Sequence, residues 1–218
     1  MSDWDADSPQ LHQNLAKVRA SIQRDAQERV VPTVAVAKVW QKTMMAGPTV
    51  PDPLCVGRFR GEAGLQNCQV RIGSALGVPP TDVADELQLF EARLQAAVSA
   101  LDQKYSVGVD LDTDGLAAVI DLAAWAHAEW VRIHPFANGN GRTARVWANL
   151  ILVRYGIPPA VRLRPRPEGG YGAACARAMQ GDWQPTALVF RVMVREVTAP
   201  PSASRLIRQG EATMNRST

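Results

Sequence analysis

The sequence predicts a mainly α-helical fold with one small β-hairpin. Apolar side chains recur at helical spacing along most of the chain, whereas only the segment 57–73 alternates polar and apolar residues as strands do. The chain has 218 residues, of which 46% are hydrophobic, so it can bury one good core. We therefore expect one helical domain with appendages at its ends.

The N-terminal part is expected to be helical. Residues 11–29 have the pattern of a polar, charged helix. The next segment, Val31 to Trp40, has Pro32 near its start. After this proline, it is compatible with a second helix or with a short extended piece.

The segment with strand character lies between Gly57 and Gly73, after a turn-prone stretch at 61–64. We expect a hairpin whose free edge could hold a target peptide by strand addition. A small hairpin that only covers the core is the alternative. The alternating residues are Cys68, Gln69, Val70, Arg71 and Ile72.

Two long helices are predicted in the middle of the chain. The first is capped by Thr81, carries acidic residues in its first turn and runs toward Lys104. After a turn at 110–115, the second helix carries His127 on its apolar face, where a core position is favoured over a metal pair with His134 because no third ligand is evident. The tryptophans expected in the core are Trp125, Trp130, Trp147 and Trp183.

The most informative segment is the run HPFANGNGRTAR at residues 134–145. Gly139 and Gly141 have no Cβ, so the backbone around Asn140 can approach a ligand closely and turn its N–H groups toward an anion. Residues 143–155 then follow a helical pattern. The loop thus leads into a helix N-terminus, where unpaired N–H groups and the helix dipole favour bound phosphate.

Three side chains of this run fit phosphate chemistry. Arg142 and Arg145 are three residues apart, so they project from neighbouring sides of one helix face and could clamp a polyphosphate or a leaving pyrophosphate. His134 lies beyond the end of the preceding helix, where its imidazole could take a proton from an incoming hydroxyl at neutral pH.

The run HPFANGNGRTAR resembles the signature of Fic domains. The resemblance extends to the segments 57–60, 70–72 and 79–80, and downstream to YGAACARAMQGD at 171–182. It implies a Fic-type helical bundle at residues 50–197, with a target-binding flap at about 57–73 and the signature loop at 134–145. Residues 1–49 would be a helical extension and residues 198–218 a mobile tail.

The resemblance also implies an activity, the transfer of AMP from ATP to a Ser, Thr or Tyr hydroxyl of a target protein, with Mg²⁺ as cofactor. His134 would be the catalytic base and Phe136 would anchor the loop in the core. The nucleotide phosphates would be bound by Gly139, Asn140 and Gly141 as an anion hole, by Arg142 at the β-phosphate and by Arg145 at the γ-phosphate.

One position departs from the family pattern. Where the family usually has Asp or Glu to hold Mg²⁺, this chain has Asn138. An amide oxygen can ligate magnesium but lacks the negative charge that a hard cation favours, so we expect weaker metal binding. Asn138 as a simple turn residue is the alternative.

A second departure is the absence of an inhibitory motif. Many family members block their own site with a helix in which Ser or Thr stands four residues before a glutamate, and none of the eight glutamates here has that neighbour. A separate small antitoxin could supply the glutamate to Arg145, which would make this chain a toxin. Otherwise the chain is restrained in another way, as a secreted effector or a housekeeping modifier, and Asn138 could itself be the restraint.

Other functions stay open at this point. The enzyme could transfer UMP or a phosphate, or the chain could be a nucleotide-binding or partner-binding module weakened by Asn138, although binding alone does not require His134. Nucleic acid is not an expected partner, because the net charge of +3 is mild. The arginines at 162, 164 and 166 alternate with prolines and are typical of a solvated loop, although contact with target or nucleotide stays open.

The cysteines and the start of the chain bear on its location. Cys55, Cys68 and Cys175 are odd in number and lack C-x-x-C spacing, which favours free thiols in a reduced compartment. Neither a signal peptide nor a membrane-spanning stretch is evident, so we expect no membrane partner and a cytoplasmic protein. Export as an effector through a dedicated secretion system would leave no recognisable mark.

Overall fold

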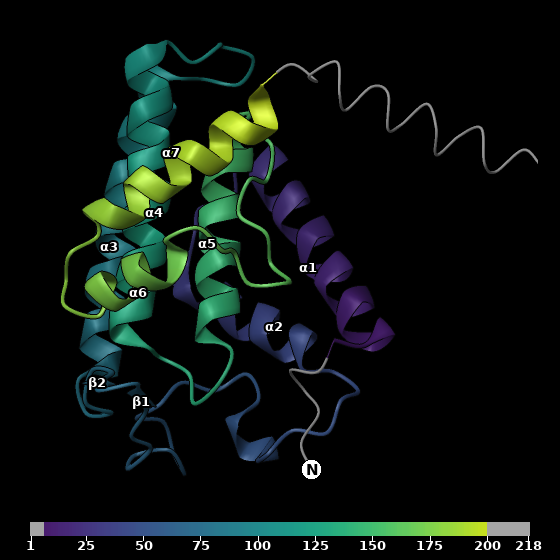
Figure 1. The fold of residues 1–218 in the computed structure, drawn as a ribbon, viewed down its shortest axis with the longest axis vertical. Helices are drawn as coiled ribbons and strands as arrows, with labels where there is room; N and C mark the ends of the chain where they lie inside the picture. Colours follow the sequence, from purple (N-terminus) through teal and green to yellow (C-terminus); the bar gives the residue numbers. More distant parts are fainter. Residues whose placement is uncertain (1–6, 200–218) are drawn as a thin grey trace, which may run out of the picture.

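Helix α5 (Asn140–Arg154) lies at the centre of a helical bundle in the computed structural model, which describes residues 7–199 (Figure 1). Thirteen of its 15 residues are buried, including polar ones near its start. Helix α4 (Thr113–Ile133) and helix α1 (Pro9–Gln27) pack directly against it. The loop predicted to bind phosphate therefore leads into the most enclosed helix of the protein.

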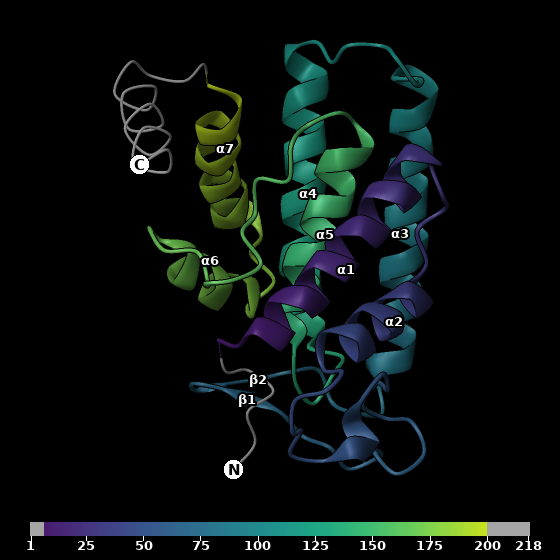
Figure 2. The ribbon, with the colours of Figure 1, turned by 90° about the vertical axis from the view of Figure 1, so that its right-hand side faces the viewer.

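The other helices surround this centre (Figure 2). Helix α3 (Val83–Lys104) packs on α4, while α6 (Tyr171–Ala178) and α7 (Gln184–Thr198) cover α4 from another side. Helix α2 (Val34–Met44) contacts α1, α3 and α5. In the described part of the chain there are seven α-helices and a single two-stranded sheet, which confirms the predicted mainly helical class.

Most predicted helices are present with shifted ends. The segment after Pro32 is helical from Val34, so its extended alternative is wrong. The prediction that Thr81 caps α3 is also wrong, since Asp82 is the residue before the first helical position and Thr81 Oγ1 contacts its carboxylate at 2.8 Å. Helix α5 begins at Asn140, three residues earlier than its apolar pattern indicated. The sequence analysis made no prediction for α7.

Aromatic side chains form the middle of the core. Trp130 and Trp147 are fully buried, as predicted, and their ring centroids are 5.6 Å apart. Phe90 contacts both of them and also stacks on Trp125. Trp125 and Trp183 are only partly buried but pack against the same cluster. Because α3, α4 and α5 all contribute rings, this cluster packs the three helices against one another.

The β-hairpin lies further along the chain than predicted. Strands β1 (Arg71–Ile72) and β2 (Ala75–Leu76) pair in antiparallel register around a turn at 73–74, and residues 57–70 form no strand. Gly61 explains part of the difference, because a Cβ there would lie 2.2 Å from the carbonyl oxygen of Pro80. This close approach folds the stretch 59–65 into turns instead of a strand.

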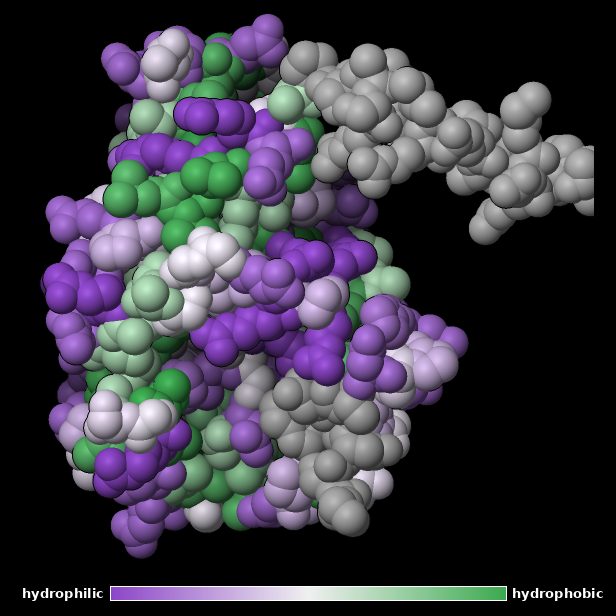
Figure 3. Space-filling view, in the orientation of Figure 1, coloured by the Kyte–Doolittle hydropathy of each residue, from purple (hydrophilic) through white to green (hydrophobic). Residues whose placement is uncertain are grey.

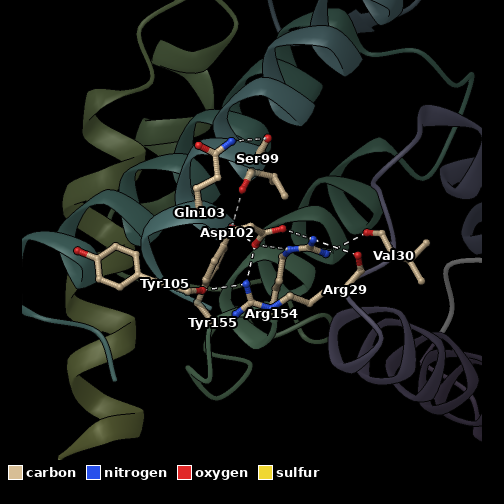
Figure 4. A network of polar contacts seen from close by, with 9 residues as sticks. Arg29, Val30, Ser99, Asp102, Gln103, Tyr105, Arg154 and Tyr155 are labelled. Atoms are coloured by element: carbon tan, nitrogen blue, oxygen red, sulfur yellow. Dashed lines mark hydrogen bonds and ion pairs between the residues drawn. The ribbon is translucent and has the colours of Figure 1, made fainter. Parts of the chain in front are cut away.

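Polar contacts tie three helices together at the end of the bundle away from the hairpin (Figure 4). Asp102 of α3 accepts hydrogen bonds from Arg154 at 2.5 Å, Arg29 at 2.8 Å and Tyr155 Oη at 2.9 Å. Arg154 also donates to the backbone oxygens of Arg29 and Val30 after α1. Burial raises the pKa of Asp102, but these bonds and charges outweigh it and lower the pKa. The carboxylate therefore stays ionised at neutral pH.

Two further predictions concern membrane-spanning helices and the C-terminal tail. No helix within residues 7–199 combines the length and the apolar character that a membrane span requires. The predicted tail at 198–218 lies outside the described residues except for Thr198 and Ala199.

Candidate active site

His134 is the first residue after α4 and has a left-handed backbone, with φ 54° and ψ 53°. Its backbone N–H donates to Trp130 O, which ends the helix. Its Nδ1 lies 3.0 Å from Val131 O, and a carbonyl can only accept, so Nδ1 carries the proton. Nε2 is therefore the basic nitrogen of the ring.

The surroundings of His134 keep its imidazole neutral. Burial lowers its pKa below the ordinary 6.5, and the nearby charge of Arg60 lowers it further, while the hydrogen bond to Val131 partly opposes the shift. A half-buried, neutral histidine with a free Nε2 is suited to accept a proton at neutral pH.

Arg60 holds the junction at which α4 ends, and the sequence analysis assigned it no role. It is 1% exposed, donates from Nε to His134 O at 2.7 Å, and donates from Nη2 to Ile133 O at 2.9 Å and Val78 O at 2.8 Å. Its Nη1 donates to Cys68 O at 3.3 Å, and its backbone N–H donates to Pro135 O. Nothing local in the sequence distinguishes Arg60 from its neighbour Arg58; only these distant partners do.

The loop after His134 is fastened from inside. Phe136 is fully buried, with its ring 4.8 Å from that of Phe59. The side chain of Asn140 accepts from Phe136 N at 2.8 Å and donates to Phe136 O at 2.7 Å. Because this pair of bonds holds the buried Asn140 amide against the backbone of Phe136, we expect the backbone N–H of Asn140, and not its side chain, to meet an anion.

The first turn of α5 is open to an anion at its backbone. Gly139 precedes the helix with φ 88°, a conformation that glycine adopts without strain. The N–H groups of Asn140 and Gly141 occupy the first two helical positions, which have no acceptor within the helix. A Cβ on Gly141 would lie 3.4 Å from Arg145 Nη1, so the guanidinium of Arg145 reaches back over this turn.

Arg145 carries a buried positive charge at this turn. It is 6% exposed and donates from Nη2 to Leu163 O at 2.9 Å and from Nη1 to Tyr171 Oη at 3.3 Å. Within residues 7–199 no carboxylate pairs with it, and its Nε has no partner. A buried charge without a counter-ion is unfavourable, so the arrangement favours binding of an anion. Arg142 is 4% exposed on the same turn.

Asn138 lies half-buried in the loop before α5. Its backbone oxygen accepts from Gln41 Nε2 at 3.3 Å, and Gln41 also contacts the backbone of Cys55 and Gly57. Its side-chain amide makes no hydrogen bond within the described part of the chain, so it is available as a ligand. Since the described residues 7–199 contain no cluster of three His, Cys, Asp or Glu side chains that could hold a metal, a cation here would need other ligands, such as phosphate oxygens.

The hairpin adjoins His134 through Gly77, another residue that the sequence analysis did not single out. A Cβ on Gly77 would lie 2.9 Å from His134 Cβ and 2.8 Å from Val70 Cγ2, so only glycine fits. Of the five predicted flap residues, Gln69, Arg71 and Ile72 are exposed, whereas Cys68 and Val70 are half-buried. Only Arg71 and Ile72 are in a strand.

His127 is fully buried in the core, as favoured from the sequence. Its Nε2 lies 2.7 Å from Tyr171 Oη, and burial together with the charge of Arg145 lowers its pKa to about 3. In the arginine-rich loop, Arg162 and Arg166 are exposed, as expected of a solvated loop, and Arg164 is half-buried. Arg166 lies over the ring of Tyr171 at 5.5 Å, and Arg164 is 3.9 Å from the carboxylate of Asp7.

Fold and site together define a helical protein with a candidate phosphate-binding site. The site consists of a glycine-led helix N-terminus, a buried guanidinium to which residues 7–199 offer no carboxylate, and a neutral histidine beside a short hairpin.

Comparison with known proteins agrees with this class. A model of the Fic/DOC family matches residues 52–152 of this chain. The chain is 34% identical to protein adenylyltransferase fic-1 of Caenorhabditis elegans over 134 residues, which are 62% of this chain and 22% of the relative. It is 34% identical to protein adenylyltransferase Fic of Drosophila willistoni over 110 residues, which are 50% of this chain and 18% of that relative. It thus spans about a fifth of the length of these curated relatives.

Solved structures share the fold. Fic-1 of C. elegans, residues 134–508, superposes with a TM-score of 0.59 and 24% identity, covering 95% of this chain and 51% of that one. BepC, a translocated effector of Bartonella tribocorum with bound AMPPNP, gives a TM-score of 0.55 and 18% identity, covering 88% of this chain and 90% of that one. The predicted Fic-type bundle is thereby confirmed.

Proposed function

We propose that this chain is a protein adenylyltransferase, which transfers AMP from ATP to the hydroxyl of a Ser, Thr or Tyr residue in a target protein. The observation that carries the proposal is the buried guanidinium of Arg145, which has no carboxylate partner in residues 7–199 and lies over the first turn of α5. The adenylyltransferase names of the related proteins support the choice of AMP.

The geometry suits an in-line transfer. His134 Nε2 would take the proton of the target hydroxyl, and the oxygen would attack the α-phosphorus of ATP while the bond to pyrophosphate breaks. The N–H groups of Asn140 and Gly141 would bind the α- and β-phosphate oxygens. Arg142 at the β-phosphate and Arg145 at the γ-phosphate would offset the charge that builds on pyrophosphate. The exposed edge of β1 would hold the target segment beside His134.

The residues fit a Mg²⁺ ion that is held mainly by the nucleotide phosphates, with the free amide of Asn138 as its protein ligand. When bound, the ion would neutralise charge on the phosphates. Asn138 would contribute one neutral oxygen, which explains why we expect weak metal affinity in the absence of nucleotide.

Asn138→Asp is expected to lower the Mg²⁺ concentration at half-maximal transfer on the order of tenfold, because a carboxylate adds a negative charge to an oxygen ligand. Asn138→Ala should raise that concentration, since it removes the ligand altogether. The measurement is a Mg²⁺ titration of labelled transfer at fixed ATP. Equal half-maximal concentrations in all three proteins would rule out metal contact at this position.

The proposed function is tested by incubating the protein with lysate, Mg²⁺ and nucleotides labelled at the α- or the γ-phosphate. Label from α-labelled ATP should appear on protein, and Arg145→Ala should reduce it by about 10²-fold or more. The matched control is Arg191→Ala, which removes an arginine of α7 that is paired with Asp121. Label from UTP would indicate UMP transfer, and label only from γ-labelled ATP would indicate phosphate transfer. No label from any nucleotide would favour a binding module.

Restraint by a separate protein is a second proposal, which the same arginine supports. Since residues 7–199 offer Arg145 no carboxylate, an antitoxin could supply a glutamate that competes with the γ-phosphate. We propose the cytoplasm as the site of action, on the sequence features alone. A short neighbouring gene that encodes Ser/Thr-x-x-x-Glu-Gly would support the toxin interpretation, and its absence would weaken it.

A further inference from the structure

Three buried side chains from different helices connect the core to the candidate phosphate site. His127 of α4 contacts Tyr171 of α6 at 2.7 Å, and Tyr171 accepts from Arg145 of α5 at 3.3 Å. His127 and Tyr171 are 0% and 1% exposed, so this chain of contacts is shielded from water. Neither His127 nor Tyr171 has a role in the chemistry described above.

The direction of the bond between Arg145 and Tyr171 can be assigned. A guanidinium only donates, so Arg145 Nη1 donates to Tyr171 Oη. Between Tyr171 Oη and His127 Nε2, the hydroxyl donates if the imidazole proton is on Nδ1, and the imidazole donates if the proton is on Nε2. Burial lowers the pKa of His127 to about 3 and raises the pKa of Tyr171, so both groups stay neutral. With either direction of the His127 bond, the hydroxyl oxygen accepts from Arg145.

The guanidinium of Arg145 is fixed at two points. Besides the tyrosine hydroxyl, the backbone oxygen of the buried Leu163 accepts from Nη2 at 2.9 Å. These two bonds use two of the five N–H donors of a guanidinium, which leaves three for a ligand. The ring of Tyr171 also lies near two cations, with Arg145 at 6.0 Å and Arg166 at 5.5 Å from its centroid.

We propose that Tyr171 is a positioning residue for Arg145. Its hydroxyl, oriented by His127, holds the guanidinium over the first turn of α5, where it meets the terminal phosphate of the nucleotide. Without this hydroxyl, Leu163 O alone fixes the group, and the guanidinium can rotate away from the phosphate. The inference rests on the proposed function, because it presumes that a nucleoside triphosphate binds at this turn.

Tyr171→Phe tests the inference, because it keeps the ring and removes only the hydroxyl. The measurement is the affinity for ATP and for ADP, each with Mg²⁺ and without target, by calorimetry. We expect ATP to bind roughly tenfold more weakly and ADP to bind within about twofold of the wild type, so the preference for ATP falls. A purely structural role would weaken both nucleotides alike.

Tyr155→Phe is the matched control. Tyr155 is also buried, and its hydroxyl contacts Asp102 at the opposite end of α5. This variant should lose stability without a change in the ATP-to-ADP ratio. A second variant, His127→Leu, removes the hydrogen-bond partner of the tyrosine hydroxyl and should lower the ratio in the same direction, while His127→Gln, which can still form a hydrogen bond, should restore part of it.

The outcomes separate this inference from the proposed function. A wild-type protein that binds neither nucleotide would contradict the proposed function itself. If the wild type prefers ATP and Tyr171→Phe keeps the full preference while remaining folded, the positioning role is wrong. If the wild type binds ATP no more tightly than ADP, Arg145 does not read the terminal phosphate, and the inference is overturned as well.

Discussion

His134→Ala is expected to lower the rate of labelled transfer by about 10²- to 10⁴-fold, while ATP affinity stays within about twofold of the wild type. The imidazole takes a proton from the target hydroxyl and has no part in holding the phosphates, so its loss affects the chemical step. The measurement combines initial rates of transfer with nucleotide binding by calorimetry. His12→Ala is the control, because His12 is an exposed histidine of α1.

The pH dependence of the wild type follows from the same histidine. The folded pKa of His134 lies below 6.5, so the imidazole is neutral and active at neutral pH. Transfer should therefore stay constant around neutrality and fall as the pH drops through the lowered pKa, where Nε2 becomes protonated. A midpoint above 6.5, or an unchanged profile in His134→Ala with comparable rates, would contradict the assignment of the base.

Arg60→Met is expected to lower the free energy of unfolding by about 3–5 kcal/mol and to abolish transfer. Methionine keeps the apolar stem but leaves four backbone oxygens, those of Cys68, Val78, Ile133 and His134, without their donor. The unsatisfied group that matters most for function is His134 O, because its bond to Arg60 fixes the backbone of the base. Urea unfolding followed by circular dichroism measures the change.

Two further variants delimit the effect of Arg60. Arg93→Met removes an exposed arginine of α3 and should change stability by no more than about 0.5 kcal/mol. Arg60→Lys should be intermediate, since an ammonium can reach only some of the four oxygens. If Arg60→Met unfolds within about 1 kcal/mol of the wild type, the arginine is not what holds the end of α4.

The sequence predicted those parts of the site that depend on local pattern. The loop 134–145, the helix after it and the helix before it follow from glycine positions and apolar periodicity, and Arg142, Arg145 and His134 lie on or beside one helix N-terminus. The side chain of Asn140 is an exception. Its residue type suits an anion loop, but its amide bonds the backbone of Phe136, a preference that only the folded loop reveals.

The missed features all depend on contacts between distant segments. Arg60 is 74 positions from His134 along the chain, and Tyr171 is 26 positions from Arg145, so no periodicity relates either pair. The prediction placed the hairpin too early in the chain. The alternating residues around Ile72 do form a strand, but the turn was assigned to 61–64, where Gly61 instead lies against Pro80. The need for glycine at position 77 was missed because it comes from the nearby Cβ of His134, which is distant in the sequence.

The packing of α1 against α5 extends the folded core beyond the segment that the family model matches. The family model matches only residues 52–152, yet Leu11, Leu15, Val18 and Ile22 of α1 are buried in the same core as α5. A fragment cut at those limits would expose the apolar side of its own central helix to water. The segment that the family model matches is therefore shorter than the segment that shares one core, and expression boundaries should be chosen from the second.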